Sequence, residues 1–384
     1  MKVDILTREY PPHVYGGAGV HAEELSKVLA ERIDVTVRAF DGKRTEADIP
    51  AIPNAADAKG SLKVVGYDTP SELADANPAL KTFGVDLQIA NDVDADIIHA
   101  HTWYACLAGY LAKMLHGTPL VITAHSLEPF RPWKREQLGG GYNLSSWGEK
   151  EAYEHADRVI AVSNLTRNIV INRYGVPADK VVTVHNAVRF AAGQCKMPER
   201  GVDDKIVTFL GRITYQKGPD YFVEAAAKVL KKVPNVRFVM AGSGDMMNHV
   251  IRRVARLGIA DRFHFTGFLR GEDVHKMFQL SDVYVMPSVS EPFGISPLEA
   301  MRSNVPVIIS KQSGVAEVLD YAVKVDYWDV DALADAIYGL IQYPALAGMF
   351  ASKGLEEVTN LKWNDAAAKI KTVYEAVIEE NKKQ

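Results

Sequence analysis

The chain has 384 residues, a formal net charge of −4, 47% hydrophobic residues and 24% charged residues. This length accommodates two domains with separate cores, and the composition is that of a globular protein. The charge balance excludes a generally basic surface for nucleic acid or anionic lipid. Cys106 and Cys195 are too few for a disulfide framework, and no cysteine–histidine pair has the spacing of a zinc site.

The N-terminal residues run directly into a predicted strand, without the apolar core of a signal peptide. No apolar stretch of the sequence approaches the length of a membrane span. We therefore expect a protein of the reducing cytoplasm that does not act at a membrane.

Strands and helices are predicted to alternate along the first half of the chain. Short apolar runs rich in β-branched residues indicate the strands, and amphipathic stretches between them indicate the helices. Residues 41–60 are polar and rich in Ala, Asp and Pro, which predicts a long surface loop. The predicted strands are residues 3–6, 34–40, 96–101, 120–124, 159–162 and 181–184.

The same alternation restarts near residue 206, after a mixed stretch at 185–204 that predicts a domain boundary. We predict an N-terminal domain of residues 1–187 and a C-terminal domain of residues 188–363, each an α/β domain with a doubly wound parallel sheet. Ligands of such sheets lie beyond the carboxyl ends of the strands, so we expect the site in a cleft between two facing domains. The predicted strands here are residues 206–210, 237–240, 263–266, 283–286 and 305–309.

The stretch VYVMPSVSEPFGISPLEAM at residues 283–301 combines a buried strand, a loop and the start of a helix. Ser296 as N-cap and Glu299 three residues later form a capping-box pattern. The free N–H groups of a helix start, next to a loop containing Gly294, predict an anion site. Because Glu291 and Glu299 flank this site, it suits a phosphate with hydroxyl groups on both sides. A nucleotide-sugar has that shape, although the capping box alone also accounts for Glu299.

Arg212 and Lys217 follow the first strand of the second half and are expected at the same sheet edge as Glu291 and Glu299. A departing diphosphate carries about two negative charges, and neutralising them is a large electrostatic contribution to catalysis. The alternative is that the two cations are solvated or paired with the two glutamates.

Three glycines, Gly16, Gly17 and Gly19, open the first predicted helix. Residues 17–22 match the G-x-G-x-x-A pattern of a dinucleotide fingerprint, but such a fingerprint has its glycines directly after a strand. Here a loop at residues 7–15 intervenes. We expect instead either a flexible helix start or a bare backbone that a phosphate or sugar can approach closely.

Histidines mark the ends of two predicted strands in the first half. His125 comes directly after a strand and before a basic, aromatic loop, and we expect it to be a site residue. His99 and His101 alternate along one strand, so one of them is expected to face the core.

The loop after His125 carries the cluster Arg131-Pro132-Trp133-Lys134-Arg135. A tryptophan can stack on a sugar ring, and Arg131 or Lys134 can bind the phosphate of an acceptor. The alternative is a solvated loop with no ligand.

In this order, the motifs resemble the retaining GT-B glycosyltransferases of family four. The pairs Gly211-Arg212 and Lys217-Gly218, with EPFG and LEAM in residues 291–301, carry this resemblance. Nearly the whole chain shares it, because TREYPPHVYGGAGVH, HAHTWYACLAG and TAHSLEPFRPWKREQLGGGYNLSSWGEKEAYEHAD are similar to the bacterial glycogen synthases of that family. This group makes maltose-1-phosphate from ADP-glucose and glucose-1-phosphate, or extends an α-1,4-glucan.

The resemblance implies roles for individual residues on the donor side. Arg212 and Lys217 would hold the donor diphosphate, and Glu291 would bind the hydroxyl groups of the transferred glucose. Glu299 would bind the ribose, and His125 would contact the glucose near the reacting carbon. The implied donor-binding set is Gly17, Gly19, Arg212, Lys217, Glu291, Phe293, Gly294, Ile295 and Glu299. The implied catalytic set is His125, Glu291, Arg212 and Lys217.

The resemblance also implies the acceptor side and the chemistry. No metal and no cofactor are expected, and the departing phosphate oxygen would take the proton of the acceptor. The last helix, at residues 364–384, would pack back on the N-terminal domain. Val14 stands where the longer glycogen and starch synthases carry a donor-side lysine, which favours the shorter enzymes. The implied acceptor-binding set is His101, Trp103, Tyr104, Arg131 and Lys134.

Alternative functions stay open at this point. The donor can be UDP-glucose instead of ADP-glucose, and the acceptor another sugar phosphate, giving a sucrose- or trehalose-type product. A non-catalytic subunit that binds a nucleotide-sugar belongs to a different class, as does a dehydrogenase. The length of the acceptor and the formation of a homo-oligomer are also open.

Overall fold

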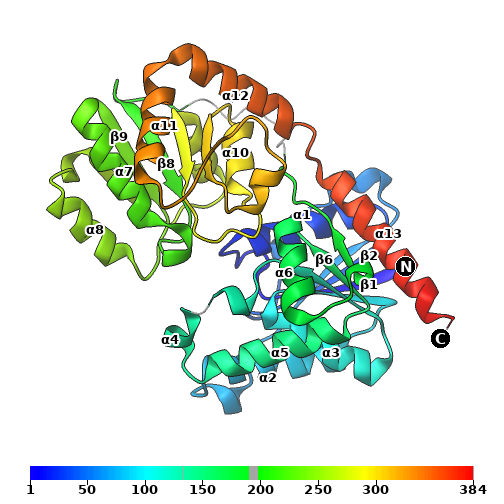
Figure 1. The fold of residues 1–384 in the computed structure, drawn as a ribbon. Helices are drawn as coiled ribbons and strands as arrows, with labels where there is room; N and C mark the ends of the chain where they lie inside the picture. The colour runs from blue at the N-terminus through cyan, green and yellow to red at the C-terminus, as the bar shows by residue number, and fades with distance from the viewer. Residues whose placement is uncertain (132, 190–197, 384) are drawn as a thin grey trace. The chain divides into compact units, whose positions relative to one another are not determined.

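The computed structural model describes residues 1–131, 133–189 and 198–383. Within them the chain forms two compact units, one of Met1–Asn186 with Trp363–Gln384 and one of Ala187–Lys362 (Figure 1). Part of the predicted boundary stretch, together with Cys195, lies outside the described residues. The facing of the two domains across a cleft stays a prediction.

The first unit contains a sheet of seven parallel strands in the order β3-β2-β1-β4-β5-β6-β7. The central strand β1 pairs with β2 on one side and with β4 on the other, with Ile5 opposite Val37 and His99. The order reverses between β1 and β4, as in a doubly wound sheet. The strands are β1 Lys2–Thr7, β2 Asp34–Ala39, β3 Leu62–Gly66, β4 Ile97–His101, β5 Leu120–Ala124, β6 Arg158–Ala161 and β7 Val181–Thr183.

Helices cover both faces of this sheet (Figure 1). Helices α2, α3 and α5 pack against one another, and α1 packs against α13. The last helix of the chain, α13, also contacts β6, so it belongs to the first unit. The helices are α1 Gly17–Ala30, α2 Pro78–Asp92, α3 Trp103–His116, α4 Lys134–Leu138, α5 Gly141–His155, α6 Asn164–Tyr174 and α13 Trp363–Asn381.

The second unit repeats the architecture with six parallel strands in the order β10-β9-β8-β11-β12-β13. The order reverses between β8 and β11. The strands are β8 Lys205–Leu210, β9 Val236–Ala241, β10 Phe263–Gly267, β11 Val283–Met286, β12 Val307–Ser310 and β13 Val323–Val325. The helices are α7 Pro219–Lys232, α8 Met247–Arg256, α9 Glu272–Leu280, α10 Ser296–Arg302, α11 Val330–Gln342 and α12 Pro344–Val358.

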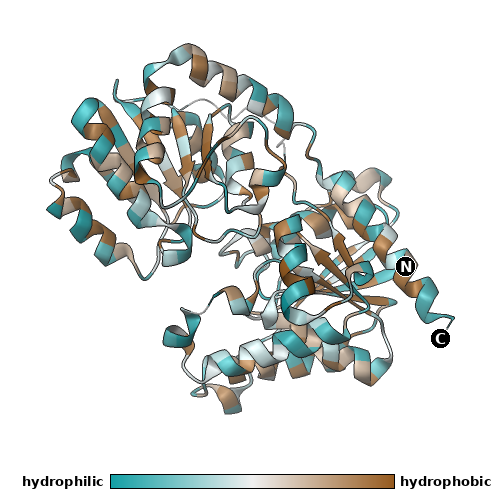
Figure 2. Cartoon of the chain, viewed as in Figure 1, coloured by the Kyte–Doolittle hydropathy of each residue, from teal (hydrophilic) through white to brown (hydrophobic). Residues whose placement is uncertain are grey.

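Each unit has its own apolar core, made mainly by the strands and the helix faces that cover them (Figure 2). Strands β4, β5, β11 and β12 are buried along their whole length. A fully buried aliphatic or aromatic side chain contributes about 1.5–3 kcal/mol, so these continuous apolar runs fix the centre of each sheet. The predicted α/β class with two doubly wound parallel sheets is confirmed.

The sequence analysis did not identify β3, α2 or β13. Strand β3 lies at the sheet edge and is only partly buried, so its apolar pattern is weak, and β13 has three residues. The start of α2 did carry a signal, because Asn77 caps the helix and Pro78 occupies its first turn. The basic, aromatic segment after His125, expected to be a loop, contains the short helix α4.

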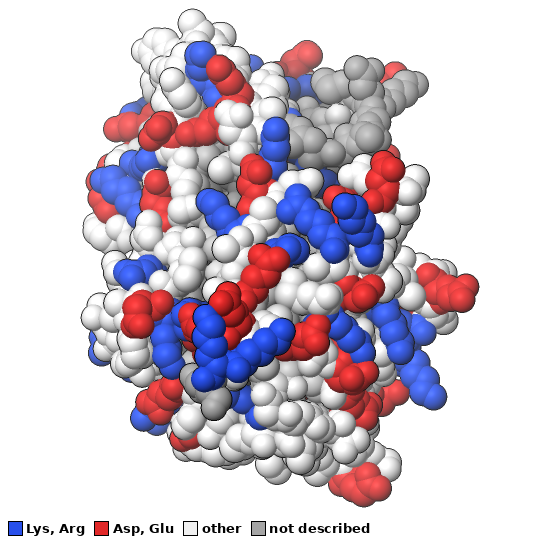
Figure 3. All heavy atoms as spheres, turned by 90° about the vertical axis from the view of Figure 1, so that its right-hand side faces the viewer, with Lys and Arg blue, Asp and Glu red and all other residues white. Residues whose placement is uncertain are grey.

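The molecular surface carries charges of both signs. On the face drawn in Figure 3, Lys and Arg side chains are interspersed with Asp and Glu side chains among the described residues. Within the described part of the chain, no helix is both long enough and apolar enough to span a bilayer.

Candidate functional site

The predicted donor residues of the second unit follow β8 and β11, the two strands between which the strand order reverses. Arg212 comes after β8, and the loop of residues 287–295 comes after β11. Parallel strands end at the same edge of a sheet, so the topology places these segments side by side at the position where such sheets bind ligands.

Lys217 and Glu291 form an ion pair at this edge through Nζ and Oε2. Glu291 is 8% exposed and also accepts a hydrogen bond of 3.4 Å from the Ser288 hydroxyl. Its carbonyl accepts from the Gly314 N–H at 2.9 Å, which fixes the backbone of the loop. The alternative of a cation paired with a glutamate therefore holds for Lys217 in the ligand-free chain.

Gln216 connects the two loops, and the sequence analysis did not identify it. Its carbonyl accepts from the Val289 N–H at 2.9 Å, and its side-chain Nε2 donates to the Ser290 carbonyl at 3.0 Å. Its Oε1 accepts from Arg212 at 3.5 Å. A buried glutamine between two motif residues has no local signature, because its role depends on contacts 74 residues away.

Gly218 permits the close approach of these segments. Its φ is +66°, in the left-handed region, and a Cβ at this position would lie 2.1 Å from the Pro287 carbonyl oxygen. Only glycine fits both requirements, which accounts for the Lys217-Gly218 pair of the motif.

The predicted capping box at Ser296 is wrong. The N-cap of α10 is Ile295, and it has no side-chain capping bond. The Ser296 hydroxyl lies inside the helix and hydrogen-bonds instead to the Tyr284 hydroxyl at 2.7 Å. A buried partner on β11 thus takes the serine that the local pattern assigned to the cap. Glu299 lies in the first turn and is half-buried.

In the loop before α10, the backbone is more accessible to an anion than the apolar side chains are. Phe293 and Ile295 are 2% and 9% exposed, so both side chains belong to the core of the second unit. Gly294 has a φ of +105° and lies between them. Their contribution to an anion site would come from N–H groups.

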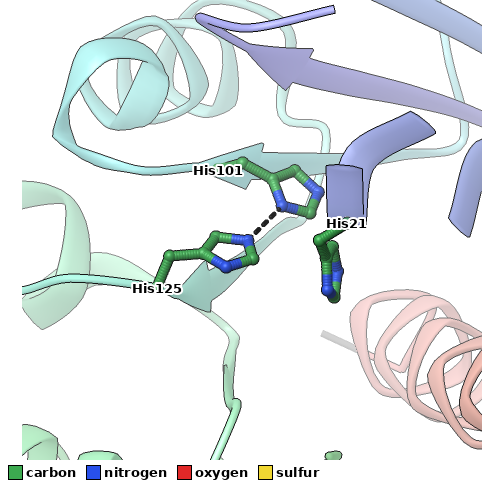
Figure 4. A group of neighbouring side chains, drawn as sticks. All are labelled: His21, His101 and His125. Carbon is green, nitrogen blue, oxygen red and sulfur yellow. Dashed lines mark hydrogen bonds between the residues drawn. The ribbon is translucent and has the colours of Figure 1, made fainter. Parts of the chain in front are cut away.

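Three histidines gather in the first unit (Figure 4). His101 ends β4, His125 follows β5, and His21 lies in α1. His101 Nδ1 and His125 Nε2 are hydrogen-bonded at 3.0 Å, and the His21 ring meets the His125 ring edge-on at 4.5 Å. His21 Nδ1 bonds to Asn186 Oδ1 at 2.7 Å. The structure brings together the two predicted histidines and adds His21.

The expectation that one of His99 and His101 faces the core holds for His99, and His101 is buried as well. Residues two apart in a strand point to the same face of the sheet, so the two rings lie together, with centroids 4.2 Å apart, and both side chains are fully buried. His99 bonds to Tyr374 at 2.5 Å and to Thr123 at 2.6 Å. His99 is therefore a core histidine, whereas His101 contacts the predicted site residue His125.

Burial keeps the histidine cluster neutral. It lowers the pKa of His21 to about 4, although the bond to Asn186 acts in the opposite direction. It also lowers the pKa values of His101 and His125 well below the usual range, and neighbouring histidines add to the effect. Neutral imidazoles can accept or donate hydrogen bonds without carrying charge into the site.

Arg131 and Lys134 share a buried carboxylate that the sequence analysis missed. Glu128 is fully buried and lies 3.1 Å from Lys134 Nζ and 3.5 Å from Arg131 Nη1. The Ser145 hydroxyl donates to its second oxygen at 2.9 Å. Burial and the charge of Arg131 lower the pKa of Lys134 to about 8. The alternative of a solvated loop is therefore excluded for these two cations, which are 9% and 6% exposed.

Trp103 and Tyr104 lie beside this cluster. Lys134 Nζ lies over both rings, 5.7 Å from the centre of Trp103 and 5.8 Å from that of Tyr104. The structure thus brings four of the five predicted acceptor residues together in the first unit. His101, the fifth, precedes Trp103 by two residues, and the intervening Thr102 has a strained positive φ of 63°.

The glycine at position 19 of α1 is required by close packing against the preceding loop. A Cβ at Gly19 would lie 2.9 Å from both Glu9 and Val14. Gly17 begins α1 and is exposed. The absent side chain at Gly19 therefore serves the close contact of the N-terminal loop with α1.

Two sequence families cover the chain. Residues 15–191 match Glycosyltransferase Family 4, and residues 196–356 match Glycosyl transferases group 1. Alpha-maltose-1-phosphate synthase of Mycolicibacterium smegmatis is 36% identical over 98% of this chain and 100% of its own length. The chain belongs to the family 4, group 1 glycosyltransferases. A second relative of this glycosyltransferase, D-inositol 3-phosphate glycosyltransferase of Salinispora arenicola, is 30% identical over 94% of the chain and 87% of its own length.

Solved structures establish the fold class of this glycosyltransferase. Sucrose-phosphate synthase of Thermosynechococcus elongatus is similar with a TM-score of 0.77, at 20% identity and 99% coverage of both chains. The Anabaena protein HepE, solved with UDP-glucose, is similar with a TM-score of 0.74, at 19% identity over 98% of this chain and 100% of its own. The predicted GT-B class is confirmed.

Proposed function

We propose that this glycosyltransferase is a retaining α-glucosyltransferase that uses ADP-glucose. Its acceptor would be glucose-1-phosphate, giving maltose-1-phosphate, or the non-reducing end of an α-1,4-glucan. The observation that carries the proposal is the end-to-end match, at 36% identity, with a protein named alpha-maltose-1-phosphate synthase. The motifs for donor and acceptor lie within that match.

On the donor side, the ion pair of Lys217 and Glu291 supports this function. A bound nucleotide-sugar would give each residue a new partner. Its diphosphate can form an ion pair with Lys217, and its sugar hydroxyl groups can donate hydrogen bonds to Glu291. Charge-assisted hydrogen bonds contribute about 1.5–3 kcal/mol each, so donor binding can offset the loss of the ion pair. Arg212, which is exposed, would supply a second cation to the diphosphate. Glu299 would bind the ribose, and the donor would lie close to the backbone of Gly17.

During transfer, positive charge develops on the glucose and negative charge on the departing diphosphate. Lys217 and Arg212 would stabilise the negative charge, which is the largest electrostatic contribution available to a reaction without a metal. His125, kept neutral by burial, would contact the glucose near the reacting carbon without adding a repelling charge. The departing phosphate oxygen would take the proton of the acceptor hydroxyl.

A second candidate is transfer from UDP-glucose to another sugar phosphate. Two similar proteins favour it: one named D-inositol 3-phosphate glycosyltransferase and one named sucrose-phosphate synthase. The buried cations Arg131 and Lys134 support a phosphate-bearing acceptor in either case.

The test is a matrix of two donors, ADP-glucose and UDP-glucose, against glucose-1-phosphate, glycogen and fructose-6-phosphate. We expect the highest kcat/KM with ADP-glucose and either glucose-1-phosphate or glycogen, with the α configuration retained in the product. Preference for UDP-glucose with fructose-6-phosphate would replace the first candidate by the second. Donor binding without turnover on any acceptor would indicate a non-catalytic subunit and overturn both.

A further inference from the structure

The histidine cluster of the first unit contains two ring nitrogens that lack a hydrogen-bond partner. His21 Nδ1 faces the Asn186 carbonyl oxygen, which can only accept, so Nδ1 carries the hydrogen and Nε2 keeps a lone pair. Both His21 Nε2 and His101 Nε2 are buried and have no partner among the described residues. A buried polar atom without a partner costs about 1–3 kcal/mol, so these nitrogens indicate a bound group.

The three rings converge from three separate elements (Figure 4). One nitrogen from each of His21, His101 and His125 lies within 4.8 Å of the other two. Nitrogen atoms that bind one tetrahedral ion at about 2.0–2.1 Å are about 3.4 Å apart. Metal binding would therefore require side-chain rotations that bring the nitrogens closer by up to about 1.4 Å.

The hydrogen bond of His21 also suits a metal. A histidine binds a metal ion through a ring nitrogen that carries no hydrogen. The bond from His21 Nδ1 to Asn186 leaves Nε2 available, which is the arrangement that fixes the tautomer of metal-binding histidines.

We propose that His21, His101 and His125 form a binding site for a divalent transition-metal ion such as Zn²⁺. Three imidazoles and an open fourth position are an established zinc ligand set. No local motif predicts this site, because its ligands are separated by 80 and 24 residues. The inference is independent of the proposed transferase activity. If His125 also contacts the donor glucose, the metal ion and the sugar would compete for this residue, and the metal would inhibit transfer.

Co²⁺ and Zn²⁺ binding to the full chain, without any sugar, tests this site. We expect one equivalent of Co²⁺ to give the visible absorption of a tetrahedral or five-coordinate ion, and one equivalent of Zn²⁺ to displace it. The variant His21→Asn removes one ligand and should weaken binding by at least 100-fold. Asn186→Ala leaves the three ligands in place and should weaken binding by about 10-fold, on the scale of a lost supporting hydrogen bond.

His264→Asn is the matched control, because this histidine of β10 is exposed and belongs to the other unit. It should bind Co²⁺ as the unaltered chain does. Circular dichroism of each variant separates loss of a ligand from loss of the fold. Absence of stoichiometric Co²⁺ binding below about 100 µM, or equal binding by a folded His21→Asn variant, would overturn the proposal. Neither result depends on turnover, so the proposed function is tested separately.

Discussion

Lys217 and Glu291 neutralise each other in the ligand-free glycosyltransferase. If Lys217 transfers to the donor diphosphate, its loss removes a contact that strengthens in the transition state. We expect Lys217→Ala to lower kcat/KM by about two orders of magnitude, or ~2.7 kcal/mol. Steady-state kinetics with saturating acceptor measure this effect.

Lys228→Ala is a suitable comparison for Lys217→Ala. Lys228 also pairs with a carboxylate of the second unit, Asp331, but it lies on the exposed face of α7. Its replacement should leave kcat/KM unchanged. Turnover of the Lys217→Ala variant near that of the unaltered enzyme would contradict the donor role.

Glu128 is expected to decide how strongly the first unit attracts an anionic acceptor. It compensates Arg131 and Lys134, so Glu128→Gln leaves two buried cations with less negative charge nearby. We expect the KM for glucose-1-phosphate to fall by about tenfold relative to that for glycogen, the scale of one charge-assisted hydrogen bond. The melting temperature should also fall, because buried cations are costly when unpaired.

Lys134→Met should shift the same ratio in the opposite direction. It removes a cation and keeps the apolar stem, so the KM for glucose-1-phosphate should rise more than that for glycogen. Lys113 of α3 forms an ion pair with Asp157, so Lys113→Met is the control and should change neither KM. Equal changes for both acceptors in the Lys134 variant would exclude a phosphate role for this cluster.

At the residue scale, the sequence predicted the side chains whose motif is local. Arg212 and Lys217 stand next to glycines in the loop after β8, and Glu291 lies three residues before Gly294 in the loop after β11, which are recognisable patterns. His21, Glu128 and Gln216 carry no such pattern. The contact of His21 with Asn186, for example, spans 165 residues, so only the folded chain shows it.

The strand–loop–helix element is the repeating unit of both sheets, and Gly218 is one of its tightly packed positions. A Gly218→Ala variant would combine a left-handed backbone, which costs about 1–2 kcal/mol, with a clash against the Pro287 carbonyl. We expect lower kcat/KM, because the loop carrying Lys217 must shift, and a lower melting temperature. Activity assays and thermal unfolding measure the two effects.

Gly271 provides the matched control for Gly218→Ala. It also has a positive φ, of +50°, but a Cβ there would meet nothing within 4 Å. Gly271→Ala should therefore lower the melting temperature slightly and leave kcat/KM unchanged. Equal kinetic effects of the two variants would show that the contact with Pro287 is unimportant.

Local patterns predicted the central elements better than the edges and ends. Strands β5 and β11 agree with their predicted residues, because a continuous apolar run identifies a strand buried on both faces. The capping box at Ser296 failed although its pattern was complete. The serine had a competing partner, Tyr284, on a strand 12 residues earlier, and tertiary contact prevailed over local propensity.

At the scale of the whole molecule, four buried histidines make stability depend on pH. His21, His99, His101 and His125 all have pKa values lowered by burial, whereas the unfolded chain titrates near 6.5. Below about pH 6.5 the unfolded state binds more protons than the folded state, so the free energy of unfolding falls as the pH falls. Each histidine lowers the free energy of unfolding by at most about 1.4 kcal/mol per pH unit. For His21 this loss ends near pH 4, the pKa of the folded state.

Urea unfolding at pH 7 and pH 5, followed by circular dichroism, measures this dependence. His99→Phe should lower stability at pH 7, because it loses bonds to Tyr374 and Thr123, but its urea midpoint should fall less on acidification. His264→Asn should show the pH dependence of the unaltered chain, since this histidine is exposed. An unchanged pH dependence in His99→Phe would contradict the lowered pKa of His99 in the folded state.

The return of α13 to the first unit has a consequence for biosynthesis. Domains usually fold in the order in which the ribosome makes them, the N-terminal one first. Here the bond between His99 and Tyr374 joins residues 275 apart, and Trp363, Ile370 and Tyr374 complete the core of the first unit. The second unit, by contrast, ends at Lys362. The nascent chain therefore carries an incomplete first unit until all of the second unit has been synthesised.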